Sequence, residues 1–410
     1  MNPLILKTDL TTIFCLPMPF NGERTFEVMQ KHNVDALIAT STENVYYLSD
    51  YWCLGKKLGC GIDAYTVLPI KGEPSIVAPL KEADLILNSN TWINDLRFYG
   101  KSGVDIIDSA EISELTKNLI NLYKEAKTNP DGLNALIKII EENKLSNSSI
   151  GLDTTGLSPS QYDYIQSRLP NATIVDGSSI LSEIRLVKTK PELERIVRAT
   201  EITEKSMEDA LEIARSEITE LDLAGMFAYS AAYDGGQVTQ NMIGIGERSA
   251  YPNPVPSTYE AKRRDMVRFT FGCSWEHYHS NISRTAVIGR PLARDQRRYE
   301  TVQKAQETAF ETISPGVKVS EVYAAVMKEL EASNVTGFDL PIGHGIGVEC
   351  NEVPNLTQDN ELELEAGMIL NIDIPLLEVG TTGAQIEDTI IITEDGCGLL
   401  SKTERTLYLL

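Results

Sequence analysis

Residues 268–285, which read RFTFGCSWEHYHSNISRT, hold two of the chain's four histidines, His277 and His279, but only one carboxylate, Glu276. Histidine titrates near neutral pH, so imidazoles gathered on one face of a strand pair suggest proton transfer. Alternation along a strand would place His277, His279 and Asn281 on one face. Packing between neighbouring strands is the alternative explanation for the same pattern.

A second candidate segment, PIGHGIGVECNEVP at 341–354, surrounds His344 with three glycines at a spacing of two. Glycine permits the backbone to approach another group closely, so this segment can present an imidazole in a crowded place. It lacks the Lys-Ser/Thr ending of a phosphate loop and the G-x-G-x-x-G spacing of a dinucleotide site. A nucleotide-binding loop is therefore not indicated.

Two carboxylates, Asp373 in LNIDIPL and Glu387 in GAQIEDTIII, lie within apolar strand-like runs. A charge in such surroundings must be paired, hydrogen-bonded or functional, because burial of a lone charge is costly. Two neighbouring carboxyl groups also push each other's pKa values apart, so one can remain ionised while the other acts as an acid. The adjacent Asp388 is expected to face the opposite way.

Charge and hydropathy limit the classes of protein to which the chain can belong. It has 410 residues, 42% of them hydrophobic, and a formal net charge of −22. A nucleic-acid backbone or an anionic membrane would be repelled by such a surface. The apolar run at 13–20 is interrupted by two prolines and no cleavage site follows, so we expect neither a signal peptide nor a membrane span. A cytoplasmic location is the expectation.

The cysteines predict free thiols rather than disulfides or a zinc site, because they are widely spaced and none forms a C-x-x-C pair. They are Cys15, Cys53, Cys60, Cys273, Cys350 and Cys397. Cys273 and Cys350 flank the candidate site in the sequence. A thiolate nucleophile is one interpretation of these two residues, and a small buried hydrophobic side chain is the favoured one.

The pattern of apolar residues predicts an α/β (α+β) protein with two domains, 1–180 and 181–410. Predicted helices cover 131–144, about 190–216 with Pro191 in the first turn, about 298–312, and 320–333 with Ser320 as the N-cap. The segments predicted as strands are 35–41, 44–52, 64–70, 74–79, 148–153, 172–178, 368–374 and 384–393.

These motifs, in this order and spacing, resemble the pita-bread family of methionine aminopeptidases, prolidases, aminopeptidase P and creatinase. NVYYLSDY resembles the signature of the family's N-terminal domain, and EIRLVKTKPELERI resembles the start of its pita-bread domain. GHGIG and IEDT are specific markers. The resemblance covers most of the chain and implies a creatinase/prolidase-like α/β domain followed by a catalytic pita-bread domain.

The metallopeptidases of this family hold two metal ions with Asp, Asp, His, Glu and Glu. The resemblance puts these five ligands at Thr270, Asn281, His344, Asp373 and Glu387. Two divalent ions need bridging carboxylates, which a hydroxyl and an amide do not replace. We therefore expect no metal cofactor; a single divalent ion on His344, Asp373 and Glu387, with His279 as a further candidate ligand, is the alternative.

Creatinase is the family's precedent for hydrolysis without metal, and the resemblance to it is incomplete. The position of its catalytic histidine holds Asn253, and the glutamate that follows the second metal position is Ser283 here. The second histidine of the family's x-H-E element is Asn351, while Glu352 remains. Neither branch of the family therefore supplies a complete mechanism for this chain.

The main hypothesis is a creatinase-like, metal-independent hydrolase that cleaves a C–N bond of a small cationic amino, guanidino or amide substrate. Two alternatives are a metal-dependent Xaa-Pro dipeptidase or aminopeptidase and a catalytically silent binding protein. The candidate catalytic residues are His344, Glu387, Asp373 and His279. The candidate substrate-binding residues are Asn253, Thr270, Asn281, His277 and Glu352.

The resemblance also implies a homodimer, in which the N-terminal domain closes the partner's pocket. Aromatic contacts from Tyr51 and Trp52 are plausible there. Arg284 is interpreted as a structural anchor of its strand. A small-molecule substrate is the only other partner that we expect.

Overall fold

The structure is a computed structural model that describes residues 20–107 and 112–410. The chain divides into two compact units, Met1–Arg185 and Leu186–Leu410. Residue 180, where the sequence places the boundary, lies inside helix α9 (Gly177–Arg185), which belongs to the first unit. Cys15 and the apolar run at 13–20, apart from Phe20, lie outside the described residues. Within the described ranges, no helix is long and apolar enough to cross a membrane.

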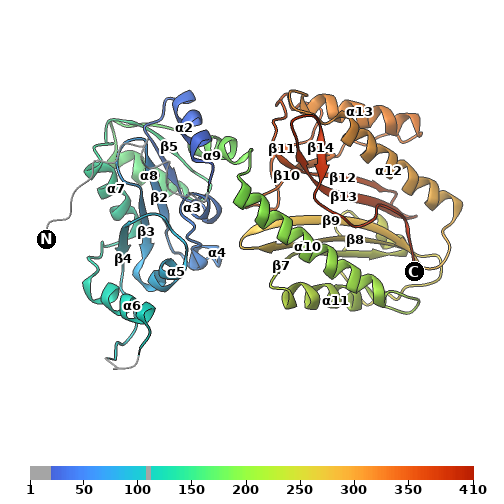
Figure 1. Cartoon of the computed structure of the whole chain (residues 1–410), viewed down its shortest axis with the longest axis horizontal. Coiled ribbons are helices and arrows are strands. Elements are labelled where there is room, and N and C mark those ends of the chain that lie inside the picture. Colours follow the sequence, from blue (N-terminus) through green and yellow to red (C-terminus); the bar gives the residue numbers. More distant parts are fainter. Residues whose placement is uncertain (1–19, 108–111) are drawn as a thin grey trace. The chain divides into compact units, whose positions relative to one another are not determined.

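The first unit is built on a six-stranded sheet with the order β4-β3-β2-β1-β5-β6. Figure 1 labels β2, β3, β4 and β5 of this sheet. The strands are β1 (Ala36–Ala39), β2 (Tyr65–Pro69), β3 (Ser75–Pro79), β4 (Asp95–Tyr99), β5 (Ser149–Leu152) and β6 (Thr173–Asp176). The helices are α2 (Gly22–Lys31), α3 (Thr42–Ser49), α4 (Leu54–Lys57), η1 (Leu80–Glu82), α5 (Ala83–Asn88), α6 (Glu114–Glu125), α7 (Gly132–Glu142), α8 (Pro159–Arg168) and α9. This mixed sheet with its helices confirms the expected α/β domain.

The strand predicted at 44–52 is wrong, because this segment forms helix α3. The Ser41 side chain caps the helix by accepting a hydrogen bond from the backbone N–H of Asn44, and Asp50 ends it in the left-handed conformation. Seven of the helix's residues are buried. A helix buried nearly all round has no polar face, so its sequence lacks the helical period that would have identified it.

The second unit is built on a nine-stranded sheet, whose main path is β11-β10-β12-β13-β9-β8-β7. Its strands are β7 (Gln237–Ile245), β8 (Met266–Trp275), β9 (Tyr278–Val287), β10 (Gly343–Gly345), β11 (Glu352–Asn355), β12 (Ile369–Leu377), β13 (Gly383–Ile392), β14 (Cys397–Leu399) and β15 (Tyr408–Leu409). The helices are α10 (Lys190–Ile213), α11 (Glu220–Tyr233), η2 (Gly246–Ala250), α12 (Ala293–Thr312) and α13 (Val319–Ala332).

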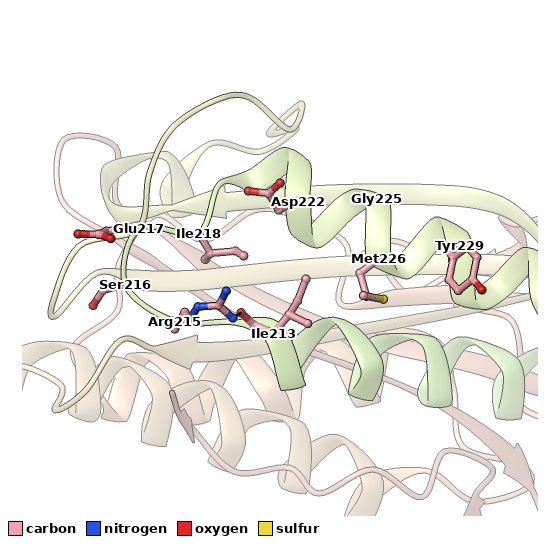
Figure 2. Close-up of a pocket in the computed structure, with 9 residues that line it drawn as sticks. All are labelled: Ile213, Arg215, Ser216, Glu217, Ile218, Asp222, Gly225, Met226 and Tyr229. Carbon is pink, nitrogen blue, oxygen red and sulfur yellow. Dashed lines mark hydrogen bonds between the residues drawn. The ribbon is translucent and has the colours of Figure 1, made fainter.

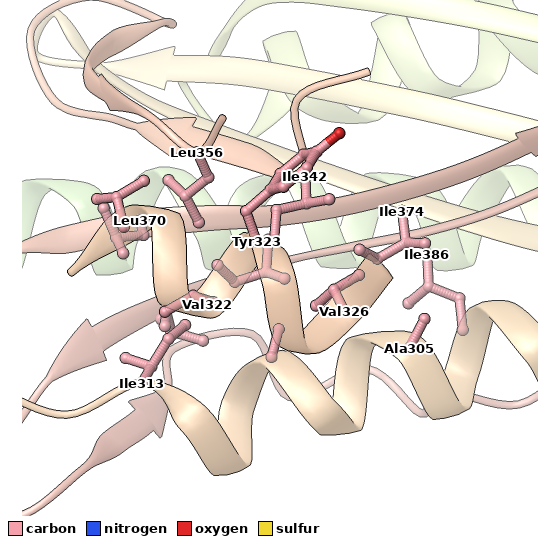
Figure 3. Close-up of a cluster of buried hydrophobic side chains, with 14 of the residues drawn as sticks. Ala305, Ile313, Val322, Tyr323, Val326, Ile342, Leu356, Leu370, Ile374 and Ile386 are labelled. Atoms are coloured by element: carbon pink, nitrogen blue, oxygen red, sulfur yellow. The ribbon is translucent and has the colours of Figure 1, made fainter. Parts of the chain in front are cut away.

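The apolar side chains of alternate strand positions pack under these helices. Ile372, Ile374 and Ile386 belong to one core with α12 and α13, part of which Figure 3 shows. Phe269 and Ile282 belong to a second core with α10 and α11. Because side chains alternate along a strand, the intervening residues of β8, β9, β12 and β13 lie on the opposite face of the sheet. That face carries the candidate site.

The structure confirms one local prediction in this domain and corrects others. Pro191 lies in the first turn of α10, as expected. The predicted helix at 190–216 ends earlier, at Ile213, and the sequence interpretation missed α11. Ser320 is not the N-cap of α13, because the cap position is Lys318; the Ser320 hydroxyl instead donates to Glu361 at 2.9 Å.

Arg284 anchors the centre of the sheet, as its predicted structural role requires. Its side chain is fully buried and forms an ion pair of 2.6 Å with Asp388, which is buried as well. It also donates to the backbone carbonyls of Glu387 and Thr403. Asp388 therefore faces away from the neighbouring Glu387, as the alternation predicts.

We expect Asp388→Asn to lower the free energy of unfolding by about 3–5 kcal/mol, because it leaves the Arg284 charge buried without its partner. Chemical denaturation followed by circular dichroism measures this loss. Lys205→Met is the control: Lys205 forms an exposed ion pair with Asp234, so its removal should cost far less. Equal losses in the two variants would contradict a structural role for the buried pair.

Candidate active site

Strand register brings four polar residues into one row across the sheet. Thr270 on β8 lies opposite Ser283 on β9, Ser283 lies opposite Glu387 on β13, and Glu387 lies opposite Asp373 on β12. The four residues are spread over more than one hundred positions of the sequence, and they come together only in the folded sheet. The structure therefore brings together three of the predicted site residues, Thr270, Asp373 and Glu387.

Hydrogen bonds occupy both oxygens of the Glu387 carboxyl group, which is only 2% exposed. The Ser283 hydroxyl donates to Oε2 at 2.7 Å, and the Asn371 amide donates to Oε1 at 3.0 Å. The Thr270 and Ser283 hydroxyls are 2.9 Å apart and continue the row. Neutral donors thus stabilise a carboxylate at the centre of the sheet.

His344 projects from β10 beside this row. Its Nδ1 lies 2.8 Å from the carbonyl oxygen of Gly345. A carbonyl only accepts, so Nδ1 carries the proton and, in the neutral ring, Nε2 has the free lone pair. Nε2 is 4.0 Å from Oε1 of Glu387.

The glycines beside His344 make close strand packing possible, as the sequence predicts. A Cβ atom on Gly343 would lie 2.1 Å from the carbonyl oxygen of Asn371, and one on Gly345 would lie 2.3 Å from that of Val353. No side chain fits at either position. The strand that carries His344 therefore runs directly against β11 and β12.

Burial and a neighbouring carboxyl group alter the titration of Asp373 strongly. Desolvation, followed by repulsion from Glu387, raises the pKa of Asp373 to about 8, although Gln385 donates a hydrogen bond of 2.7 Å to Oδ1. Desolvation also raises the pKa of Glu387, against the hydrogen bonds from Ser283 and Asn371. The pair can therefore hold a proton at neutral pH, as the sequence analysis expects.

A buried arginine, Arg268, stands on the same face as Thr270, two residues earlier on β8. It is 2% exposed and donates to the carbonyl oxygens of Ser249, at 2.7 Å, and Tyr251. It also donates to Oε1 of Gln385. Desolvation lowers the pKa of Arg268 to about 10, and attraction to Asp373 opposes that change.

The two histidines of the β8–β9 hairpin do not share a strand face, so that expectation is wrong. His277 and Glu276 form the turn between the strands, with φ values of +66° and +45°. His279 does lie on the face of the row, but it is four residues from Ser283, which corresponds to about 13 Å along a strand. The backbone N–H of His279 donates to the carbonyl oxygen of Gly347.

The remaining predicted residues are not members of the row. Asn281 is buried, and its amide group donates to Sγ of Cys350 at 3.2 Å. Glu352 forms a buried ion pair of 3.0 Å with Lys188, which fixes the segment after His344. Asn253 lies in an exposed loop, and no hydrogen bond joins it to the row among the described residues.

The two candidate thiols differ in their surroundings. Cys273 is buried and lies 2.8 Å from the hydroxyl of Thr203, on helix α10, and desolvation raises its pKa. The Cys350 thiol lies beside Asn281, and desolvation raises its pKa as well. Raised pKa values disfavour the thiolate, so neither cysteine is prepared to act as a nucleophile.

Sequence reasoning missed three residues that hold the site together, namely Arg268, Asn371 and Gln385. Each lies two positions before a residue that it did identify: Thr270, Asp373 and Glu387. Strand alternation could have found them, since residues i and i+2 share a face. They were missed because none of them is a histidine, an acid, a cysteine or a position matched to the family's sites.

A separate hollow in the second unit, about 620 Å³ in volume, does not contain the site (Figure 2). It lies where α10 leads into α11 and is lined by Ile213, Arg215, Ser216, Glu217, Ile218, Asp222, Gly225, Met226 and Tyr229. None of these residues belongs to the row of polar side chains. We assign no function to this hollow.

Comparison with known families now identifies the two domains. Residues 23–187 match the Creatinase/Prolidase N-terminal domain, and residues 194–394 match Metallopeptidase family M24. These ranges follow the two structural units closely. The chain is a hydrolase of the M24 family, with a creatinase-type N-terminal domain followed by a pita-bread domain, which confirms the expected fold.

Several curated proteins and solved structures are similar to this chain. The Xaa-Pro dipeptidase of Pyrococcus furiosus is 33% identical over 231 residues, which cover 56% of this chain and 66% of that protein. The Xaa-Pro dipeptidase of Pyrococcus horikoshii is 27% identical over 393 residues, covering 94% and 97%. The crystal structure of the prolidase from Pyrococcus horikoshii OT3 matches with a TM-score of 0.75 and 25% identity, covering 94% and 99%.

These relatives correct the main functional hypothesis. A creatinase-like hydrolase of a small cationic amino or guanidino compound is not what the comparisons support, because the matched proteins are Xaa-Pro dipeptidases and prolidases. The hypothesis was wrong because it gave the altered ligand positions more weight than the rest of the chain. The first alternative, a metal-dependent Xaa-Pro dipeptidase or aminopeptidase, agrees better with the comparisons.

The residues at the family's metal positions do not fit a pair of divalent cations. Among the described residues, no cluster of three or more His, Cys, Asp or Glu side chains is arranged to hold a metal ion. The oxygens of Glu387 and Oδ1 of Asp373 already accept hydrogen bonds from neutral side chains. Thr270 and Asn281 add no negative charge, and Arg268 adds a positive one.

We expect stability to fall as the pH rises from about 4 to about 8, because the folded state holds a proton on Asp373 that the unfolded state, with a pKa of about 3.9, releases. Above pH 8 this contribution becomes constant. Asp373→Asn should flatten the slope in that window, as measured by urea denaturation at several pH values. The same substitution at the exposed Asp359 is the control, and an unchanged slope in Asp373→Asn would contradict the raised pKa.

Proposed function

We propose that the chain hydrolyses short peptides of the Xaa-Pro type at the row formed by Thr270, Ser283, Glu387 and Asp373. The observation that carries this proposal is the match to an Xaa-Pro dipeptidase across 97% of that relative's length. The site contributes an acid, a carboxylate and an imidazole, which are the groups that hydrolysis of an amide requires.

Asp373 is suited to protonate the leaving group. The nitrogen of an Xaa-Pro bond carries no hydrogen, so it must gain a proton before it can leave as the amine of proline. With a pKa of about 8, Asp373 is mostly protonated at neutral pH and can donate that proton. Gln385 holds its Oδ1, which fixes the direction of the carboxyl group.

His344 and Glu387 are suited to receive the proton of the attacking water. Nε2 of His344 has the free lone pair and faces Oε1 of Glu387 across 4.0 Å. The water oxygen would form the new C–O bond while its proton passes to the imidazole, and the C–N bond breaks as Asp373 donates. Thr270 and Asn281 then remain candidates for hydrogen bonds to the peptide groups of the substrate.

The location and assembly of the protein also remain proposals. We infer a cytoplasmic homodimer, which the family resemblance supports together with the absence of disulfides among the described cysteines. Tyr51 is not suited to reach a partner, because it is buried and its hydroxyl donates to Glu82 at 2.6 Å. Trp52 remains the candidate aromatic contact.

Peptide assays test the proposed reaction. Gly-Pro and Ala-Pro are offered to the full chain, once after chelator treatment and once with added Mn²⁺, with Ala-Ala and creatine as control substrates. We expect release of proline from both Xaa-Pro peptides and little reaction of the controls. Failure to release proline under both metal conditions would overturn the proposal and leave the silent binding protein.

Glu387→Gln and His344→Ala should each lower kcat by about 10²–10⁴-fold, because each removes a group that handles a proton. Both variants should still bind the peptide, as measured by calorimetry. Asp359→Asn, an acid-to-amide change at an exposed position, is the control and should retain turnover. Unchanged kcat in Glu387→Gln would exclude this carboxylate from the chemistry.

A further inference from the structure

Arg268 is a buried cation whose side-chain hydrogen bonds go to neutral groups. Its guanidinium hydrogen bonds go to the carbonyl oxygens of Ser249 and Tyr251 and to the amide oxygen of Gln385, all of which are neutral acceptors. Among the described residues, no carboxylate forms a salt bridge with it. A full charge is costly to bury in this way, so its presence beside the site needs an explanation.

Gln385 links this cation to the acidic pair. Its Oε1 accepts from Arg268, and its Nε2 donates to Oδ1 of Asp373 at 2.7 Å. The guanidinium thus determines which way the amide points, since an arginine can only donate. Through the amide, it also orients the Asp373 carboxyl group.

The guanidinium is held from its other side as well. The two backbone carbonyls that accept its hydrogen bonds belong to Ser249, in η2, and to Tyr251, the residue after η2. η2 is itself tied to the sheet, because the Ser249 hydroxyl accepts a hydrogen bond from the backbone N–H of Gly383 at the start of β13. Arg268 is therefore fixed in place rather than available to swing towards a ligand. This arrangement favours a permanent internal charge over a site that captures an anionic substrate.

We propose that Arg268 is a positioning residue that supplies the carboxyl pair Asp373 and Glu387 with a fixed positive charge, where the family's metallopeptidases use divalent cations. A cation joined to Asp373 through one amide side chain lowers the affinity of the pair for Mn²⁺ by electrostatic repulsion. Thr270 and Asn281 stand where the family's metallopeptidases have aspartates, so this site has two negative charges fewer. Arg268 offsets part of the negative charge that the two remaining carboxyl groups can carry. The inference does not depend on the substrate.

Titration with Mn²⁺ alone, by calorimetry on the chelator-treated full chain, tests this role. The starting variant is Thr270→Asp/Asn281→Asp, which returns acidic side chains to two of the five family positions. Adding Arg268→Gln should tighten Mn²⁺ binding at least about tenfold. Adding Arg268→Lys, which keeps the charge, should leave the binding weak. Equal affinities in the Gln and Lys variants would overturn the proposal, since a merely structural arginine predicts no difference.

Circular dichroism establishes that each variant is folded before it is titrated. If the acidic variants do not fold, the comparison is made in the natural background, where Arg268→Gln should bind Mn²⁺ more tightly than Arg268→Lys and the natural chain. No difference there would overturn the proposal equally. Because the readout is metal affinity, its failure is distinct from a failure to hydrolyse Xaa-Pro peptides.

Discussion

The site depends on one electrostatic constraint: two carboxyl groups, that of the partly buried Asp373 and that of the buried Glu387, lie opposite each other on neighbouring strands. Such a pair is unstable when both members are charged, because desolvation and repulsion act in the same direction. In this chain, hydroxyl and amide donors stabilise Glu387, and a proton stabilises Asp373. Arg268 donates a hydrogen bond to Gln385, which in turn donates one to Asp373.

The rest of the pita-bread domain maintains this pair. Four helices cover one face of the sheet with apolar side chains, so polar residues at the intervening positions gather on the other face. The buried ion pair of Arg284 and Asp388 fixes the strand next to Glu387 from the helix-covered side. Strand register, rather than a flexible loop, therefore sets the positions of the groups that react.

Much of this arrangement could be predicted from local sequence. The acids in apolar strands identified Asp373 and Glu387, and the glycines drew attention to His344. The fold and the place of Thr270 came from the family resemblance that the order of the motifs carries. Helices such as α3 were missed because burial on all sides removes the helical period. The His277 prediction failed because the turn residues of a hairpin interrupt the alternation, and the sequence does not show where the turn falls.

The function required the comparisons as well as the residues, and the two give different information. The relatives indicate which kind of bond the proposed reaction breaks. The side chains at the family's metal positions indicate how charge is balanced in the site. An anomalous diffraction map from crystals grown with Mn²⁺ tests the central claim most directly. We predict Gln385 and Arg268 in hydrogen-bond contact beside Asp373 and no pair of manganese peaks. Two peaks bridged by Asp373 and Glu387 would contradict it.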